Sequence, residues 1–308
     1  EMTVSDEILK RMADAYRRIR NTMRFLLANL DGFEPSKDLI SGDKMLALDF
    51  WVVQAVQKLQ NDITEAYDKY EFHNVYQKLH NFCTIELGGF YLDIIKDRIY
   101  TTQKNSITRR SAQTAIYYII EALVRLMSPI LSFTAEEIWK IIPGEREQSV
   151  KASVFLDAWY LYPEMTSNYP DMNLDYWALV MEVRDVVSKR LEELRTVGEI
   201  GSSLDAEVDL YCGREIYEKL AKLDDELRFV LITSYARIQL VETPPENAKH
   251  ITLSTNDEIW IEVAASSFDK CIRCWHHRED VGSIPEHPEI CSRCVDNITG
   301  SGESRSYA

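Results

Sequence analysis

The feature that most constrains this chain of 308 residues is a set of four cysteines near its end. Cys271 and Cys274 form one Cys-x-x-Cys pair, sixteen residues follow, and Cys291 and Cys294 form a second pair. Each pair makes a tight turn that aims two sulfurs at one point, so two pairs predict a tetrahedral site for one Zn²⁺. Because four protein ligands leave no open position, this zinc is expected to be structural and to activate no water.

Alternatives to zinc are two disulfides or an iron ion held by four thiolates. Three histidines between the pairs could compete as ligands: His276, His277 and His287. The segment from about Phe268 to Ala308 is too short to bury a useful core, so metal binding is expected to supply its fold. Cys83 and Cys212 lie far from the cluster and are predicted to be buried free thiols, which indicates a reducing, cytoplasmic location.

The overall charge argues against nucleic-acid binding by bulk electrostatics. The formal net charge is −15, whereas a protein that attracts phosphate by its total charge should be basic. The chain shows no run of 18 apolar residues, and its acidic, polar start predicts no signal peptide. We therefore expect no membrane contact, and any RNA binding must use a local basic face.

Such a face is predicted on the first helix, over residues 5 to 30. Ser5 is placed to cap it, and Gly32 lies just past its end. An apolar stripe recurs at steps of three and four residues: Ile8, Met12, Ala15, Ile19, Met23, Leu26 and Leu30. Basic side chains, among them Lys10, Arg17, Arg20 and Arg24, fall with Asn21 on the opposite side. An ordinary solvated helix face is the alternative interpretation.

Helical patterns continue through the first half of the chain. They cover Met45 to Tyr67, Glu71 to about Arg98, and Thr108 to Met127, and a capping box at Thr134–Glu137 is expected to open a short helix. After a linker, a helix from Tyr176 to Arg195 precedes three strand-like runs and a helix from Arg214 to about Leu231. The runs are 207–211, 236–241 and 259–263.

The predicted fold is mainly α, with three parts. An antiparallel helical bundle covers residues 1–160, a linker helix and small α/β domain cover 161–267, and a four-cysteine zinc module covers 268–308. No phosphate-binding glycine loop and no nucleophile elbow occur, and no catalytic residue is predicted.

Several stretches resemble the C-terminal half of bacterial isoleucyl-tRNA synthetases. They are Ser5–Thr22, Phe90–Arg98, Arg110–Thr114, Pro129–Trp139, Gly201–Val208 and the Cys-Ile-Arg-Cys-Trp-His segment that starts at Cys271. The helical bundle is shared with the valine and leucine enzymes, whereas the cysteine module with Trp275 is similar to that of the isoleucine enzymes. One departure is Phe50 in Asp49-Phe50-Trp51, where the family usually carries a basic residue.

The resemblance implies a tRNA-binding fragment of a larger ligase. The family's His-x-Gly-His and Lys-Met-Ser-Lys-Ser signatures and its editing domain are absent from these residues, so the missing catalytic half would use ATP to attach isoleucine. The implied partners are isoleucine tRNA, bound by its anticodon arm, and that catalytic half; a monomer is expected.

Eight residues are the predicted tRNA contacts. Arg17, Arg20, Asn21 and Arg24 would bind the first helix to phosphates, and Arg273, Trp275, Arg278 and Arg293 would contact unstacked anticodon bases. Shielding of the thiolates is the alternative role for Trp275, and charge balance is the alternative for the nearby arginines.

Two rival functions follow from the same features. DNA glycosylases of the formamidopyrimidine type end in a similar cysteine module, but they would need a Pro-Glu amino terminus and a β-rich first domain. A protein-binding scaffold that contacts no RNA is the other rival, consistent with the acidic total charge.

Overall fold

A computed structural model describes residues 4–144 and 152–308 of the protein. The chain forms two compact units, one of Glu1–Asp93 with Arg110–Asn168 and the other of Ile94–Arg109 with Tyr169–Ala308. The predicted fold class is confirmed, since the chain is mainly helical and carries a small four-stranded sheet and a cluster of four cysteines. The predicted boundaries at residues 160 and 267 stay predictions.

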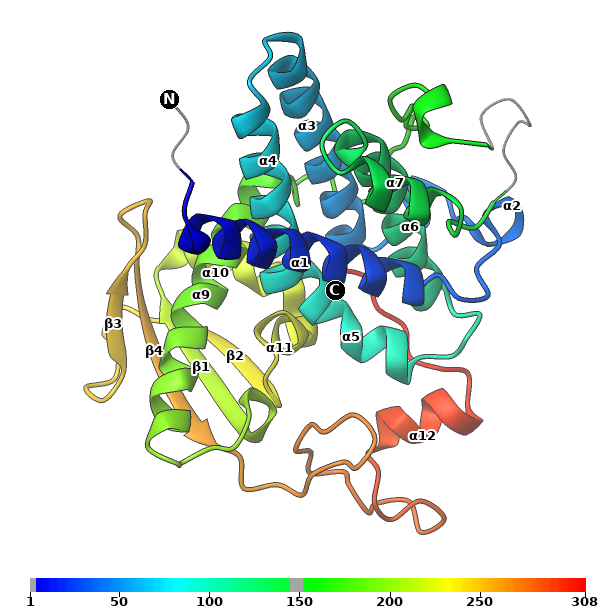
Figure 1. Cartoon of the computed structure of the whole chain (residues 1–308). Coiled ribbons are helices and arrows are strands. Elements are labelled where there is room, and N and C mark those ends of the chain that lie inside the picture. The colour runs from blue at the N-terminus through cyan, green and yellow to red at the C-terminus, as the bar shows by residue number, and fades with distance from the viewer. Residues whose placement is uncertain (1–3, 145–151) are drawn as a thin grey trace. The chain divides into compact units, whose positions relative to one another are not determined.

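The first unit is helical (Figure 1). Its long helices are α1 (Asp6–Ala28), α3 (Ala47–Asp68), the α4 helix (Phe72–Asn81) with its π-helical continuation η2 (Phe82–Tyr91), and most of α6 (Ile107–Met127). Shorter elements are α2 (Pro35–Asp38), η1 (Gly42–Lys44), α7 (Ser132–Trp139) and η3 (Val154–Leu156). The helices α3 and α4 form a hairpin whose joint is closed by Tyr70, which adopts a left-handed φ of 58°.

Helix α1 begins where the sequence predicts. Ser5 accepts a hydrogen bond from the Ile8 amide at 3.3 Å, so it caps the helix as expected. The predicted apolar stripe is buried from Ala15 to Leu30, but Ile8 and Met12 are 41% and 48% exposed. The apolar stripe is therefore exposed in the first two turns of the helix and buried only from Ala15 onwards.

The predicted capping box at Thr134 is also wrong. Helix α7 already begins at Ser132, and its N-cap, Leu131, offers no side-chain hydrogen bond. The Thr134 hydroxyl instead lies 2.9 Å from the hydroxyl of Tyr16, which joins α7 to α1. The sequence matches a capping box, but the Thr134 hydroxyl bonds to Tyr16 of α1 and does not cap α7.

Asp49, the acidic residue of the Asp49-Phe50-Trp51 segment, lies in the core of the first unit. Its carboxylate is fully buried and accepts hydrogen bonds from the hydroxyls of Tyr91, at 2.7 Å, and Ser111. A buried carboxylate is tolerated only when such donors replace water. Asp49 therefore connects α3 to η2 and α6 inside the first unit.

The second unit contains a sheet with strand order β2-β1-β4-β3. Its strands are β1 (Ala206–Cys212), β2 (Tyr235–Leu240), β3 (Lys249–Thr252) and β4 (Glu258–Ala265); β1 and β2 are parallel, and the other pairs are antiparallel. Its helices are α9 (Leu174–Thr196), α10 (Arg214–Leu220), α11 (Leu227–Leu231) and α12 (Ser292–Thr299), together with most of α5 (Leu92–Thr101) and the first residues of α6. Two 3₁₀ turns, η4 (Ser203–Asp205) and η5 (Ala221–Glu226), complete it.

One face of this sheet is buried and the other is charged. Val208 and Leu210 of β1 pair with Val263 and Ile261 of β4, and these four side chains are buried. On the opposite face Arg237 bridges two acids of the neighbouring strand, with 2.7 Å to Asp209 and 2.8 Å to Glu207. This alternation is what the strand pattern predicts.

Two features of this unit differ from the sequence-based prediction. Strand β3 is missed, because its four residues include only one partly buried apolar side chain, Ile251. The helix expected over 214–231 is broken at Asp224, whose φ of 47° and ψ of −136° are not helical. No proline or glycine marks this break in the sequence.

Cys83 and Cys212 are buried free thiols, as predicted. Burial raises the pKa of Cys83 to about 12 and that of Cys212 to about 11, so both stay protonated and unreactive near neutral pH. Within the described ranges, no helix is long and apolar enough to cross a membrane.

Candidate metal centre and nucleic-acid interface

The four terminal cysteines come together in the second unit. Cys271, Cys274, Cys291 and Cys294 are buried, and their sulfurs all lie within 4.8 Å of one another. A zinc–sulfur distance of about 2.3 Å implies sulfur–sulfur edges of about 3.8 Å in a tetrahedron, and the Cys274 and Cys291 sulfurs are 3.7 Å apart. All four thiols are free, which removes the disulfide alternative.

Two different local structures position the sulfurs. The first pair lies on a tight hairpin, where the Trp275 amide donates to the Cys271 carbonyl and the Cys271 amide donates to the His276 carbonyl, both at 2.9 Å. The left-handed φ of 68° at Trp275 turns the chain back. In the second pair, Cys291 is the N-cap of α12 and Cys294 lies in its first turn.

Apolar side chains surround this cluster, and backbone amides face its sulfurs. Ile290 and Val295 are buried against the cysteines, and Val281 and Ile284 pack from outside. The Cys291 amide donates to the Cys271 sulfur at 3.4 Å, an interaction that favours a thiolate. The all-sulfur donor set, its spacing and its burial fit a four-coordinate structural zinc.

The three histidines do not join the cysteines. His276 is buried, but its Nδ1 atom lies 3.2 Å from the Cys274 carbonyl and its ring packs edge-on against Phe229. His277 contacts the Phe268 carbonyl at 2.6 Å. Among the described residues, the only group of three or more cysteine, histidine or acidic side chains with metal-binding geometry is the four cysteines.

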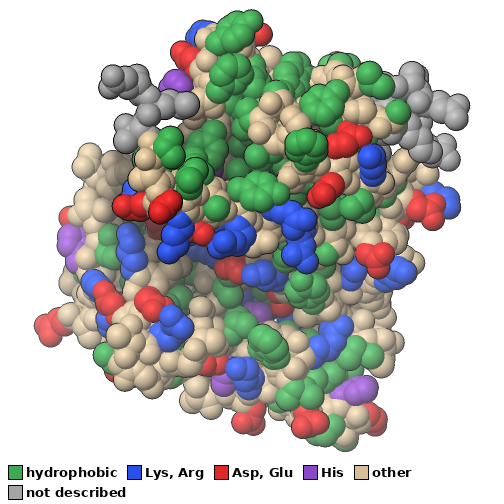
Figure 2. All heavy atoms as spheres, viewed as in Figure 1, with side chains coloured by type: hydrophobic (Ala, Val, Ile, Leu, Met, Phe, Trp, Pro, Cys, Tyr) green, Lys and Arg blue, Asp and Glu red, His purple; other side chains and the backbone are tan. Residues whose placement is uncertain are grey.

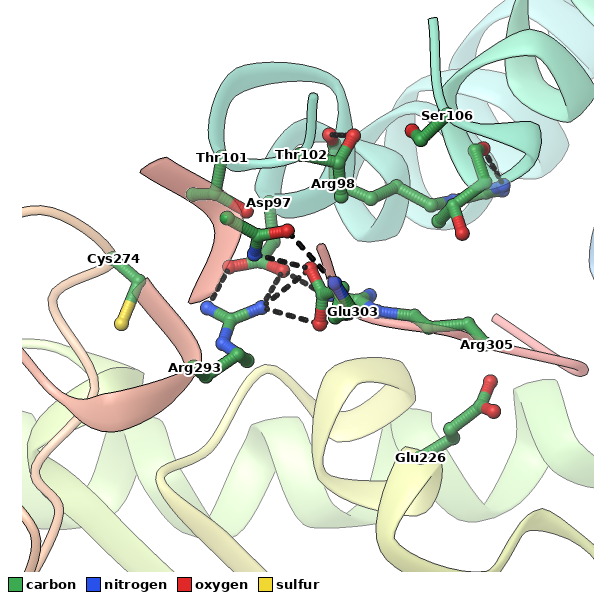
Figure 3. A network of polar contacts seen from close by, with 12 residues as sticks. Asp97, Arg98, Thr101, Thr102, Ser106, Glu226, Cys274, Arg293, Glu303 and Arg305 are labelled. Carbon is green, nitrogen blue, oxygen red and sulfur yellow. Dashed lines mark hydrogen bonds and ion pairs between the residues drawn. The ribbon is translucent and has the colours of Figure 1, made fainter. Parts of the chain in front are cut away.

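The Arg293 side chain lies in a buried network of ion pairs (Figure 3). Its guanidinium donates to both carboxylate oxygens of Asp97, at 2.8 and 2.9 Å, and to Glu303 at 3.2 Å. Arg305 also contacts Asp97 and lies 3.1 Å from Glu303. The four side chains are between 2% and 15% exposed, so two cations and two anions balance each other away from water.

This network changes the titration of its acids. Burial alone would raise the pKa of Asp97, but the charges of Arg293 and Arg305 hold that pKa well below its usual range. The pKa of Glu303 is lowered by the same arginines against the same effect of burial. Both carboxylates are therefore ionised at neutral pH, and Arg293 links α12 of the cysteine module to α5.

Arg273 and Arg278 also have protein partners within the second unit. The Arg273 guanidinium donates to the Thr101 carbonyl at 2.7 Å. Arg278 donates to the Ser234 carbonyl at 3.3 Å and lies over the ring of Tyr235, 4.2 Å from its centroid. Each side chain is partly exposed, so neither is withdrawn from solvent.

Trp275 differs from these arginines because its side chain is 61% exposed. It does not cover the thiolates, and the neighbouring Ile272 is 59% exposed. Trp275 therefore does not shield the thiolates from solvent. An exposed indole on a rigid turn is a suitable stacking surface.

In the first unit, Lys and Arg side chains gather along α1 (Figure 2). Arg17, Arg20, Asn21 and Arg24 are all exposed, as predicted. Arg17 pairs with Asp14 at 2.8 Å, and Arg20 lies 3.8 Å from Glu137. Both ion pairs are exposed to solvent, so they contribute little to the stability of the protein. A phosphate can therefore displace either acidic partner from its arginine.

Comparisons with known proteins identify two segments. Residues 49–210 match the profile described as "Anticodon-binding domain of tRNA ligase", and residues 268–297 match "Zinc finger found in FPG and IleRS". The first match spans more than half of the chain. It disfavours the alternative of a DNA glycosylase, because the zinc-finger profile is the only one of the two that refers to those enzymes.

Several curated proteins with similar sequences are described as isoleucine–tRNA ligases. Over 308 residues the chain is 54% identical to the ligase of Thioalkalivibrio sulfidiphilus and 52% identical to that of Methylococcus capsulatus. Over 309 aligned residues it is 54% identical to that of Pseudomonas putida strain KT2440. Each comparison covers the whole chain but only 32% of the relative, so the chain spans about a third of the length of the curated relatives it matches. By its main profile match, the chain belongs to the family of tRNA ligase anticodon-binding domains.

Proposed function

We propose that this chain is the tRNA-binding, C-terminal portion of an isoleucine–tRNA ligase and that it holds isoleucine tRNA by the anticodon arm. The observation that carries the proposal is the exposed basic face of α1 in a chain whose net charge is −15. A local cationic surface on an acidic body directs a polyanion to one place. We infer that the tRNA is specific for isoleucine because the chain is similar to isoleucine–tRNA ligases.

The proposed contacts divide by chemistry. Arg17, Arg20, Asn21 and Arg24 bind phosphates and set the register of the RNA without reading sequence. Trp275 offers its exposed ring to an unstacked anticodon base. Arg273 and Arg278, which lie close to Trp275 in sequence and are partly exposed, would donate hydrogen bonds to the same RNA segment. Arg293 is left out of the contact set, because its guanidinium is occupied by Asp97 and Glu303.

In this proposal Cys271, Cys274, Cys291 and Cys294 hold one zinc ion. The metal would fix the shape of the module, and with four thiolate ligands it would leave no position for a substrate. Attachment of isoleucine to tRNA with ATP would belong to the remainder of the ligase. We expect the complete protein to act as a monomer in the cytoplasm, where its tRNA resides.

Charge reversal on α1 tests the proposal against a scaffold that binds no RNA. The double variant Arg17→Glu with Arg24→Glu should weaken binding of isoleucine tRNA by at least about tenfold at moderate salt, because it replaces two attractions with two repulsions. The matched control is Arg190→Glu with Arg195→Glu, on α9, where each arginine pairs with a neighbouring glutamate. Equal affinities for the two double variants would favour the scaffold.

A further inference from the structure

A groove in the first unit lies between α1 and α7. It has a volume of 520 Å³, and its walls include Tyr16, Arg17, Arg20 and Asn21 from α1 and Phe133 and Glu137 from α7. Tyr16 and Thr134 both line this groove, and the hydrogen bond between their hydroxyls, at 2.9 Å, joins the two helices there. The groove is therefore a built feature and not a gap between two independent helices.

Phe133 is the unusual member of this set. Its side chain is 90% exposed, and it is the most exposed of the large hydrophobic residues in the part of the chain that the structure describes. Its own backbone is fixed, since it lies in the first turn of α7 and the preceding Ser132 donates to the Ser128 carbonyl at 2.9 Å. A rigidly held but uncovered aromatic ring is a ready stacking surface.

Charge and hydrogen bonding in the groove indicate what fits beside the ring. Arg17 and Arg20 are 68% and 44% exposed, and the acidic residues that they pair with, Asp14 and Glu137, are themselves exposed to solvent. Asn21 can both donate and accept hydrogen bonds, and the Glu137 carboxylate accepts them. Cations, a free aromatic face and a mixed set of polar groups together match a nucleotide, which combines a phosphate, a flat base and a polar base edge.

We propose that this groove binds one unpaired nucleotide of the RNA, with its base stacked on Phe133 and its phosphate on Arg17 and Arg20. The inference rests on the proposed function and adds a second base-binding site, separate from Trp275. The Glu137 carboxylate lies 3.8 Å from the Arg20 guanidinium. A phosphate bound by Arg20 would displace this carboxylate, which would then accept a hydrogen bond from an amino or imino group of the base. The site therefore disfavours double-stranded RNA, whose bases are already stacked and paired.

A protein partner is the weaker interpretation of the groove. Phe133 shares the groove with Ala13 and Tyr16, but also with two arginines, an asparagine and a glutamate. These polar groups interrupt the contiguous apolar patch that an apolar protein partner favours. The exposed apolar residues of the first turns of α1, such as Ile8 and Met12, are not among its lining residues. A protein occupant would also leave the response to an RNA loop unchanged, which the experiment below detects.

The test compares two identical substitutions. Phe133→Leu removes the ring in the groove, and Phe155→Leu removes one that is 54% exposed elsewhere in the same unit. Binding of an RNA hairpin with the anticodon-arm sequence of isoleucine tRNA is measured by fluorescence anisotropy over a range of salt concentrations. Base–aromatic stacking predicts that Phe133→Leu weakens binding about fivefold to a hundredfold, with the dependence on salt unchanged. Phe155→Leu should stay within about twofold of the original chain.

The same hairpin with abasic nucleotides in its loop identifies the stacked base. If a base lies on Phe133, removing that base should abolish the difference between the original chain and Phe133→Leu. Equal effects of Phe133→Leu and Phe155→Leu would overturn the proposed groove site while leaving RNA binding intact. Absence of hairpin binding by the original chain would overturn the proposed function and this inference together.

Discussion

The buried ionic network of the second unit leads to a quantitative prediction for Asp97→Asn. This change keeps the shape of the side chain and removes one of two negative charges, so Arg293 and Arg305 are left with Glu303 alone. Breaking a buried ion pair by removing one partner costs about 3–5 kcal/mol, because the remaining charge has neither a partner nor water. The exposures of 14% for Arg293 and 2% for Arg305 place this network in that class.

The matched control is Asp14→Asn on α1. Asp14 also pairs with an arginine, Arg17, at 2.8 Å, but the two side chains are 46% and 68% exposed. An exposed pair of this kind contributes about 0–1 kcal/mol. The two substitutions are chemically identical, so a difference between them reports the burial of the network and not the loss of an aspartate as such.

A compensating change sharpens the test. Asp97→Asn combined with Arg305→Met restores charge balance, since one glutamate and one arginine remain. We expect this double variant to regain part of the lost stability; the recovery is incomplete because Arg305 also stacks on Phe229, 3.5 Å from its ring centroid. A further loss in the double variant would show that charge imbalance is not the cause.

Hydrogen exchange measured by mass spectrometry is the suitable assay. The chain has two compact units, so a single unfolding free energy would mix them, whereas exchange reports each segment separately. Asp97→Asn should speed exchange in α12 and in residues 94–101 of α5 while α3 and α4 keep their protection. If α12 were protected equally in Asp97→Asn and in Asp14→Asn, the buried network would not stabilise this helix.

Three further predictions concern metal, pH and salt. Cys274→Ser should release zinc and increase exchange over residues 268–308 while the bundle keeps its helical circular dichroism; full zinc content by mass spectrometry would contradict this. Acid should loosen the second unit: Asp205, beside Lys270 and Ser202, has a pKa of about 2, so its contribution is present above about pH 4 and is lost as the pH falls towards 2. Asp205→Asn should flatten that part of the stability–pH curve, and an unchanged curve would count against it. The logarithm of tRNA affinity should fall linearly with the logarithm of salt concentration, by roughly 0.7–0.9 per phosphate neutralised; a flat response would exclude the basic face of α1.

Local sequence signals predicted much of this architecture. The N-cap at Ser5, the long helices and the convergence of four cysteines each depend on spacings of a few residues, and those spacings are visible in one sequence. Strand β3 and the helix break at Asp224 were not predicted, because neither carries a sufficiently long pattern or a glycine or proline.

The predictions that failed or remained incomplete depend on distant contacts. Arg293 looked like an exposed arginine inside a Cys-x-x-Cys turn, but its partner Asp97 lies 196 residues away in sequence. Thr134 looked like a helix cap, but Tyr16 takes its hydroxyl. Nothing in the sequence indicates that the Phe133 ring is exposed, since an apolar residue at the start of a helix is ordinarily assigned to the core. A single sequence does not specify which segments meet.

We propose that the chain recognises isoleucine tRNA through its anticodon. The most direct measurement compares binding of the chain to isoleucine tRNA with binding to the same tRNA carrying a replaced anticodon, at one fixed salt concentration. We expect a clear loss of affinity for the replaced anticodon, because the phosphates are unchanged and only base contacts differ. Equal affinity for the two tRNAs would show that the chain binds phosphates without reading the anticodon.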